Sequence, residues 1–365
     1  MTIGFLATGD EIVCGDTLNS NTKEMANALA SEGLPLGLHM SCKDSEKEIV
    51  TCLEFLKTQH DIIIITGGLG PTSDDLTRFA LAEVLNTPLV ENAEALAHIK
   101  ARLKRANLSL NPGHHQQCLF PEIAELLPNP NGSALGCIIQ NESHIFVMLP
   151  GPPYECLPMF NTNVLHRLSK TEHHQEQLLK WMLFGVAEGE ISWQLEAALK
   201  GLNCRTGYRL QMPYIEFKVF CDKSLVDTIT DKLMPIIEPL IISPAHQTAS
   251  QQLQLAIADN QWTISINDEV TAGRLETALH HRNTHDLIQF NTKSPANIHF
   301  KLSGLEAYWK DEQSSETIIT VDYAINGKIG TMSKTLVFRS PLVIYAAVEW
   351  LSFCLLQLIN DKQCS

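Results

Sequence analysis

An unbroken run of isoleucines, Ile62 to Ile65, constrains the fold of this chain more than any other feature. β-Branched residues favour strands, and a strand that is apolar on both faces is typical of a parallel sheet covered by helices. The run leads directly into the sequence Thr66-Gly67-Gly68-Leu69-Gly70-Pro71-Thr72-Ser73-Asp74-Asp75. A helical pattern follows from Thr77 to Leu85. The sequence therefore predicts a buried strand, a glycine-rich turn and a helix, in that order.

The glycine-rich turn has the composition of a ligand site. Gly67, Gly68 and Gly70 let a ligand approach the backbone, so that N–H groups can hold phosphate oxygens. Asp74 and Asp75 add carboxylates, which are the ligands that hard cations prefer. The turn is neither a Gly-Lys-Ser/Thr nucleotide loop nor a dinucleotide-binding turn. These residues alone are equally consistent with an ordinary structural turn.

The first part of the chain alternates between strand and helix patterns. Strands are expected near 3–8, 36–41 and 61–66, with helices at 20–32 and 45–58. Such alternation indicates a mostly parallel sheet with helices on both faces, and ligands then bind at the carboxyl ends of the strands. The residues that follow these strands should therefore converge there. Asp44 is one of them, although it could equally cap the helix at 45–58.

Composition excludes several other functions. The net charge of −14 argues against a nucleic-acid partner, and a phosphorylated ligand would need a metal, backbone amides or local positive charge. No uninterrupted apolar run approaches the roughly 20 residues of a membrane span, and the N-terminus does not resemble a secretory signal. The ten cysteines contain no C-x-x-C pair. We therefore expect reduced thiols in a cytoplasmic protein that binds neither membrane nor nucleic acid.

Several motifs in order resemble the competence-damage-inducible (CinA) family. They are Gly9-Asp10-Glu11, Asn19-Ser20-Asn21-Thr22, the glycine-rich turn, Asn131-Gly132-Ser133-Ala134 and Leu149-Pro150-Gly151-Pro152-Pro153. The resemblance is strong over roughly residues 1–170 and weaker beyond them. The N-terminal domain of this family is similar to the molybdopterin-binding domains of molybdenum-cofactor biosynthesis.

The resemblance implies an architecture of three parts. Residues 1–170 would form an α/β molybdopterin-binding-like domain, residues 171–245 a small α+β middle domain, and residues 246–365 a C-terminal α/β domain. The segment from His173 to Gln177 is expected to be a linker, and Thr206 to Arg209 a turn of the middle domain. Family members are dimers, so a homodimer is expected, with an interface that uses residues beyond 170.

The resemblance also implies a reaction. The N-terminal domain of the family is associated with metal-dependent hydrolysis of ADP-ribose at its pyrophosphate, so the expected ligand is a small phosphorylated nucleotide. A divalent cation (Mg²⁺, Mn²⁺ or Co²⁺) would be held by members of the set Asp10, Asp44, Asp74 and Asp75. Asp75, Asp74 and Asp44 are the candidate catalytic residues, and the sequence does not assign which is ligand and which is base.

The candidate substrate-binding residues follow from the same motifs. They are Gly9, Asp10, Glu11, Asn19, Asn21, Thr66, Gly67, Gly68, Gly70, Pro71, Thr72, Asn131, Gly132, Ser133, Pro150 and Gly151. The adjacent His114 and His115 are not expected to bind metal, because no third ligand lies at a useful spacing.

The C-terminal segment departs from the family. There a strand ends in a turn that presents the serine nucleophile of a nicotinamide-nucleotide amidohydrolase. Here the turn reads Asn267-Asp268-Glu269-Val270-Thr271-Ala272-Gly273, and Glu269 stands at the position of the serine. A carboxylate cannot replace that nucleophile, so the amidase site is expected to be degenerate. The alternatives to the pyrophosphatase are a non-catalytic pterin- or nucleotide-binding module and, last, a working amidase.

Overall fold

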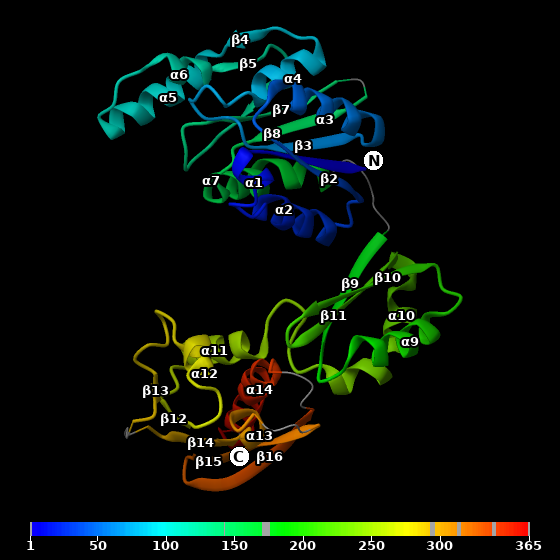
Figure 1. The fold of residues 1–365 in the computed structure, drawn as a ribbon, viewed down its shortest axis with the longest axis vertical. Coiled ribbons are helices and arrows are strands. Elements are labelled where there is room, and N and C mark those ends of the chain that lie inside the picture. Colours follow the sequence, from blue (N-terminus) through cyan, green and yellow to red (C-terminus); the bar gives the residue numbers. More distant parts are fainter. Residues whose placement is uncertain are drawn as a thin grey trace. The chain divides into compact units, whose positions relative to one another are not determined.

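The computed structural model describes residues 2–141, 143–169, 176–292, 296–311, 315–337 and 341–363. The chain divides into two compact units, residues 1–177 and 178–365, drawn in Figure 1. The expected linker residues 173–175 lie outside the described residues.

The first unit is built on a sheet of six strands in the order β2-β1-β3-β8-β7-β6. Strands β1 (Ile3–Thr8), β2 (Leu36–Cys42), β3 (Ile62–Thr66) and β8 (Ile145–Leu149) run parallel, as the isoleucine run predicted. Strands β7 (Gly136–Gln140) and β6 (Glu125–Leu127) continue the sheet in antiparallel fashion. The isoleucines of β3 are completely buried. The expected mostly parallel α/β fold is confirmed.

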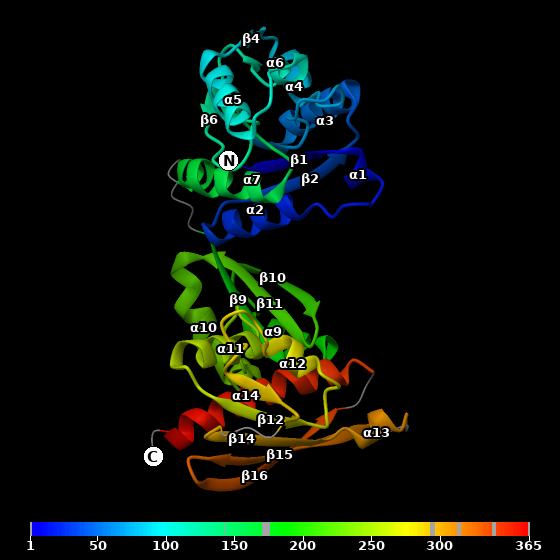
Figure 2. The ribbon, with the colours of Figure 1, turned by 90° about the vertical axis from the view of Figure 1, so that its left-hand side faces the viewer.

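Helices cover both faces of this sheet (Figures 1 and 2). Helices α3 (Glu46–Gln59), α4 (Thr77–Leu85) and α5 (Ala93–Ala106) pack on one face, over a core that includes Ile63 and Ile65. Helices α2 (Ser20–Ser31) and α7 (Pro153–Met159) pack on the other face with Ile62 and Ile64. The side chains of β3 therefore alternate between two separate cores, which is why the whole run is apolar.

Shorter elements complete the first unit. These are α1 (Asp10–Val13), β4 (Leu89–Glu91), α6 (Pro112–Gln116), β5 (Leu119–Pro121), a π-helix (Phe160–Leu165) and α8 (His166–Ser169). His114 and His115 lie in α6, where His114 joins Asn111 in a capping box. The adjacent histidines thus take part in helix capping and in a contact between His115 and Glu91.

The second unit begins with a three-stranded sheet in the order β10-β11-β9. Strands β9 (Glu176–Phe184), β10 (Cys204–Gln211) and β11 (Tyr214–Asp222) pack against α9 (Glu188–Leu199) and α10 (Val226–Ile237). The expectation of a turn at Thr206 to Arg209 is wrong. These residues lie inside β10, paired with β11, and the turn falls at Met212 and Pro213.

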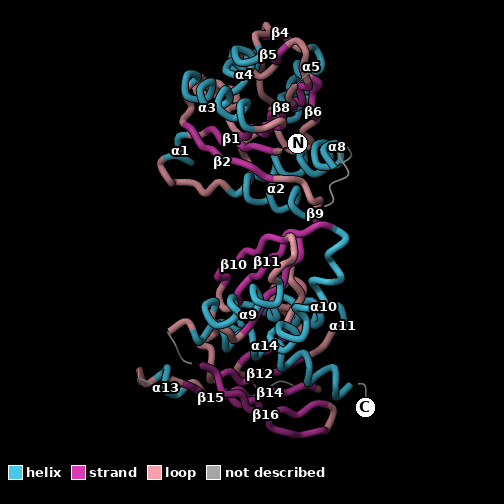
Figure 3. The backbone as a smooth tube through the Cα atoms, turned by 90° about the vertical axis from the view of Figure 1, so that its right-hand side faces the viewer, coloured by secondary structure: helices cyan, strands magenta, loops and turns pink. Residues whose placement is uncertain are grey.

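The unit continues with a five-stranded sheet in the order β13-β12-β14-β15-β16. Its strands are β12 (Ile264–Asp268), β13 (Ile288–Phe290), β14 (Ile298–Gly304), β15 (Glu316–Ile325) and β16 (Lys328–Val337). Helices α11 (Ala249–Asn260), α12 (Arg274–Leu279), α13 (Glu306–Trp309) and α14 (Val343–Gln363) accompany them (Figures 1 and 3).

Helix α14 is strongly apolar in composition. Its stretch Val343–Asp361 is long and apolar enough to cross a membrane by length and composition alone, and 72% of that stretch is buried inside the structure. Ile344, Ala347 and Leu351 belong to the same core as the five-stranded sheet. The apolar face of α14 is therefore a core face, as expected for the central helix of a folded unit.

A buried polar network connects the two parts of the second unit. The Tyr214 hydroxyl donates to Glu349 Oε2 at 2.6 Å, and the Ser250 hydroxyl donates to Glu349 Oε1 at 2.6 Å. Tyr214 lies on β11, whereas Glu349 and Ser250 lie on α14 and α11. Because hydrogen bonds to a buried carboxylate are costly to break, this network ties residues 178–245 to residues 246–365. The chain forms two compact units, and its division into three domains stays a prediction.

Candidate functional site

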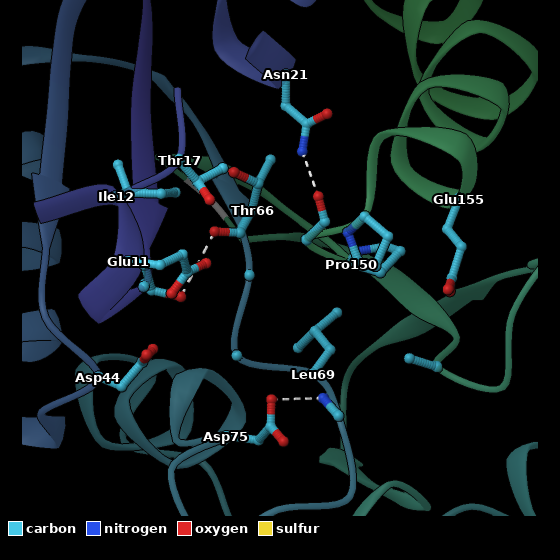
Figure 4. Close-up of a pocket in the computed structure, with 18 of the residues that line it drawn as sticks. Glu11, Ile12, Thr17, Asn21, Asp44, Thr66, Leu69, Asp75, Pro150 and Glu155 are labelled. Carbon is cyan, nitrogen blue, oxygen red and sulfur yellow. Dashed lines mark hydrogen bonds between the residues drawn. The ribbon is translucent and has the colours of Figure 1, made fainter. Parts of the chain in front are cut away.

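A cavity of about 400 Å³ lies at the carboxyl ends of β1, β3 and β8, where an open parallel sheet places its ligands. Its volume falls within the roughly 300–1,000 Å³ of small-molecule sites. The loops after these strands supply most of its wall. Figure 4 shows Glu11 and Asp44 on one side of this cavity and Glu155 on the other.

The structure brings together most of the residues predicted from the sequence. Those that line the cavity are Gly9, Glu11, Asn19, Asn21, Asp44, Thr66, Gly67, Gly68, Gly70, Pro71, Asp74, Asp75, Ser133, Pro150 and Gly151. Four others, Asp10, Thr72, Asn131 and Gly132, do not line it. Thr72 nevertheless donates hydrogen bonds to Asp75, which lines the cavity. Gly132 donates to Asn129, which in turn donates to Glu155 of the wall.

The glycine-rich turn lies so close to other segments that side chains cannot be accommodated at two of its positions. Gly67 and Gly68 have φ angles of 101° and 64°, in the region that favours glycine. A Cβ atom on Gly67 would meet the carbonyl oxygen of Thr8, and one on Gly68 would meet the hydroxyl of Thr77. The turn therefore requires glycine at these positions for its conformation.

Hydrogen bonds from behind fix the carbonyl groups of this turn. Thr77 Oγ1 donates to the carbonyl of Gly67 at 2.9 Å. Arg78 Nη2 donates to the carbonyl of Leu69 at 2.6 Å, and Gln117 Nε2 donates to the same oxygen at 3.2 Å. In a trans peptide the carbonyl and the following N–H point in opposite directions. Because the carbonyls of Gly67 and Leu69 point toward these donors, the N–H groups of Gly68 and Gly70 point away from them.

Only some of the N–H groups of the turn are free to bind a ligand. The Gly67 N–H donates to Leu149 O at 3.1 Å, and the Gly70 N–H donates to Asp75 Oδ1 at 2.7 Å. The expectation that Gly67 and Gly70 present their amides is therefore not met in this structure. Within the described chain, the N–H groups of Gly68 and Leu69 have no hydrogen-bond partner. These two are the candidate phosphate donors.

Asp75 organises the turn from its far end. Besides the Gly70 N–H, its carboxylate accepts the Thr72 N–H at 2.8 Å and the Thr72 hydroxyl at 2.5 Å. Gln116 Nε2 in turn donates to the carbonyl of Asp75 at 2.9 Å. With three donors already bound, this carboxylate is placed to hold the loop.

Asp44 occupies a different environment, at the amino end of α3. Its Oδ2 accepts the N–H of Asp10 at 3.1 Å. Burial raises the pKa of the Asp44 carboxyl above its ordinary value, and the charges of Glu11, Asp10 and Asp74 raise it further. Hydrogen bonding from Thr72 instead lowers the pKa of Asp74. Burial and the neighbouring negative charges therefore both favour the protonated form of Asp44.

The cavity is strongly acidic. Its wall contains five carboxylates, Glu11, Asp44, Asp74, Asp75 and Glu155, and no lysine, arginine or histidine appears among the described residues that line it. No group of three histidine, cysteine, aspartate or glutamate side chains in the described ranges is arranged to hold a metal ion by itself. A phosphorylated ligand would therefore meet a wall of like charge unless a cation accompanied it.

Sequence reasoning missed several residues of the wall. Glu155 is 8% exposed and accepts from Asn129 Nδ2 at 2.6 Å, while Asn129 Oδ1 accepts the N–H of Gly132 at 2.8 Å. Gln117 also lines the cavity. Nothing in the local sequence distinguishes these side chains from ordinary polar residues. The one sequence signal for Glu155 is its position two residues after the expected Pro152-Pro153 turn.

Asn21 connects two motifs that are distant in sequence. Its Nδ2 donates to the carbonyl of Gly151 at 2.6 Å (Figure 4), and its Oδ1 is buried without a partner in the described chain. This contact joins the amino end of α2 to the loop after β8. Both motifs were expected to contribute to one site, and here they form adjacent parts of one wall.

Comparison with known proteins agrees with this picture. Residues 4–170 match the family model described as "Probable molybdopterin binding domain". A competence-damage inducible protein from Thermoanaerobacter sp. (strain X514) is 32% identical over 279 residues, which cover 74% of this chain and 67% of that protein. One from Caldanaerobacter subterraneus subsp. tengcongensis is 36% identical over 278 residues, with the same shares covered.

Solved structures match part of this chain. The protein CinA from Thermoplasma acidophilum is 26% identical, with a TM-score of 0.43, and the match covers 46% of this chain and 99% of that one. The molybdopterin biosynthesis enzyme MoaB from Thermus thermophilus is 18% identical, with a TM-score of 0.32, over 46% of this chain and 94% of its own. On the sequence relationship with these relatives, the chain belongs to the competence-damage inducible, CinA-like family, with a molybdopterin-binding-like domain at its N-terminus.

Proposed function

We propose that the first unit hydrolyses the pyrophosphate bond of a nucleoside-diphosphate sugar such as ADP-ribose, together with a divalent cation. The observation that carries the proposal is the composition of the cavity wall. The free N–H groups of Gly68 and Leu69 suit phosphoryl oxygens, whereas the remaining wall offers carboxylates and no basic side chain in the described residues. A diphosphate fits such a wall when a cation lies between the two negative partners.

The residues present are compatible with such a cation. Magnesium and similar ions are commonly held by one or two carboxylates, with substrate phosphates and water as the other ligands. The lack of three preorganised protein ligands in the described chain is consistent with that kind of site. Asp74 would hold the cation, together with the phosphates and water, since Asp75 is engaged in the loop and Asp44 is left as the proton acceptor. Bound there, a divalent cation neutralises the diphosphate and lowers the pKa of a coordinated water.

Each of the chain's own groups then has a defined task. The N–H groups of Gly68 and Leu69 bind the phosphoryl oxygens on which negative charge develops. Asp44, whose pKa is raised, takes the proton of the attacking water. Asp75 fixes the loop that carries the N–H groups. Asn21 holds the loop after β8 in place through its hydrogen bond to the carbonyl of Gly151.

The test is to incubate the full chain with ADP-ribose and added Mg²⁺, Mn²⁺ or Co²⁺ and to separate the products. We expect AMP and ribose 5-phosphate, and no product after a chelator has been added. A chain that binds ADP-ribose with each cation but releases no AMP would instead support the non-catalytic binding module. In that case the same cavity would serve as a nucleotide or pterin receptor.

The amidase alternative receives less support from the second unit. Glu269 is exposed in the turn after β12, and Asp268 Oδ1 accepts the N–H groups of Val270 and Thr271, each at 2.9 Å. An acyl-transfer site needs free N–H groups in such a turn to stabilise the oxyanion. Here the turn uses two of them internally. We therefore propose the pyrophosphatase and not the amidase.

A further inference from the structure

The least expected group near the cavity is a buried arginine behind its wall. Arg78 lies in the first turn of α4 and is 0% exposed. Its Nη2 donates to Leu69 O, but its Nε and Nη1 are buried without a hydrogen-bond partner in the described chain. The guanidinium lies 5.4 Å from the centre of the Phe120 ring. A buried cation with unpaired donors is expensive, and proteins seldom retain one without a use.

Burial is the main influence on this group. It lowers the pKa of the Arg78 guanidinium to about 10, partly opposed by the negative charge of Asp75. At neutral pH the side chain therefore stays charged, without a carboxylate in ion-pair contact among the described residues. The carbonyl of Leu69 accepts the hydrogen bond from Arg78, and the charge of Asp75 raises the pKa of Arg78. Both Leu69 and Asp75 line the cavity. The charge thus lies directly behind the glycine-rich turn.

We propose that Arg78 is a positioning residue that attracts the phosphates of the ligand from behind the turn. This inference rests on the proposed function for the class of ligand. Arg78 acts in two ways. It holds the glycine-rich turn in place through the Leu69 carbonyl, and its charge supplies the positive potential that the lining side chains lack. Because it is enclosed in protein, its field is screened by salt much less than that of a surface residue.

The proposal makes opposite predictions for stability and for binding. Arg78→Met removes a buried charge that has little compensation, so the variant should unfold at the same temperature as the wild type or higher. Leu69 O keeps its second donor, Gln117. Binding of a phosphate ligand should nevertheless weaken by about tenfold or more, the scale of a lost charge-assisted interaction. A matched control is Arg105→Met, at an exposed position on α5, which should change neither quantity appreciably.

A lysine at the same position separates charge from shape. A buried lysine loses its proton more easily than arginine. Arg78→Lys should therefore bind the ligand within about threefold of the wild type at mildly acidic pH. It should lose affinity as the pH rises and the lysine is neutralised. The wild type should show no such loss over that range.

The experiment measures binding of the α,β-methylene analogue of ADP-ribose, which cannot be cleaved between its phosphorus atoms, and of inorganic pyrophosphate. Both are titrated calorimetrically into the full chain and its variants, with a divalent cation present, at low and at high salt. Weaker binding by Arg78→Met at both salt concentrations, without loss of thermal stability, supports the inference. Equal binding by wild type and Arg78→Met, or equal weakening in Arg78→Lys at every pH, overturns it.

These outcomes differ from those that decide the proposed function. A wild type that binds the analogue or pyrophosphate, but cleaves no ADP-ribose, refutes the hydrolysis and leaves Arg78 fully testable. If the wild type binds neither probe, the cavity is no phosphate site and the role of Arg78 is refuted as well.

Discussion

The carboxylate of Asp75 accepts the N–H of Gly70 at 2.7 Å, across five residues of chain. It also accepts both donors of Thr72, so one side chain closes the glycine-rich turn on itself. An aspartate in this motif need not touch the ligand to be essential. It shapes the surface that the ligand meets.

The first prediction concerns Asp75→Asn. The substitution preserves size but replaces one acceptor oxygen with a donor, which then faces the donors of Gly70 or Thr72. We expect the turnover of ADP-ribose to fall by about 100-fold, the scale of a misplaced binding group, while circular dichroism shows an intact fold. Wild-type turnover in this variant would refute the assigned role of Asp75.

The second prediction concerns Asp44→Asn. The pKa of Asp44 is raised in the folded state, so its ionisation costs stability as the pH rises through that pKa. The variant cannot ionise. It should therefore be as stable as the wild type at acidic pH and at least as stable near neutrality, measured by thermal unfolding without added metal. Exposed Asp16→Asn is the control.

The same variant should lose hydrolytic activity, because the proposed proton acceptor is absent. In the wild type, the rate should decline toward acid with a pKa above the ordinary value of 3.8. Undiminished turnover in Asp44→Asn would show that another group accepts the proton.

The third prediction concerns Glu269→Ser. If Glu269 alone had inactivated an amidase, serine at this position would restore the activity. We expect no amidase activity in the variant. The N–H groups of Val270 and Thr271 are occupied by Asp268, and groups that act as a catalytic unit are strongly non-additive. The assay measures nicotinate mononucleotide formed from nicotinamide mononucleotide. Detectable product would mean that the turn retains a functional oxyanion site.

The fourth prediction is that the full chain is a homodimer that uses residues beyond 170. Strand β16 has ten residues at the edge of its sheet and exposes Ile329 (84%) and Met332 (42%). Long apolar edges readily pair with another chain, and we propose that a second copy covers this one. Light scattering at micromolar concentration should give a dimer, and Ile329→Lys should weaken it. A monomeric wild type would contradict the prediction.

Local signals in the sequence were sufficient for several elements. Helix α4 has the expected bounds, Thr77–Leu85, and Asn86 adopts the left-handed conformation directly after its last residue. Strand β3 was evident from its isoleucines. Because parallel strands place ligands at their carboxyl ends, the sequence predicted that Asp44 and Gly67 meet at one cavity, and both line it. These features depend on residues that are close in sequence or on general sheet topology.

Features that depend on tertiary contacts were not predictable in this way. Strand β10 carries polar residues and Gly207 within the segment expected to turn, and only pairing with β11 makes it a strand. The burial of Arg78 is equally invisible, because a charged residue in the first turn of a helix is ordinarily exposed. The partner of each N–H in the glycine-rich turn also depends on distant atoms, such as Leu149 O.

The most direct measurement of the central claim is the fate of ADP-ribose cleaved in oxygen-labelled water with Mg²⁺, Mn²⁺ or Co²⁺ present. The account predicts AMP and ribose 5-phosphate, with one labelled oxygen incorporated into the phosphate of one product, since water attacks phosphorus at the pyrophosphate. Asp44→Asn should form little of either product. Free ADP and ribose, or no cleavage with any of these cations, would contradict the account.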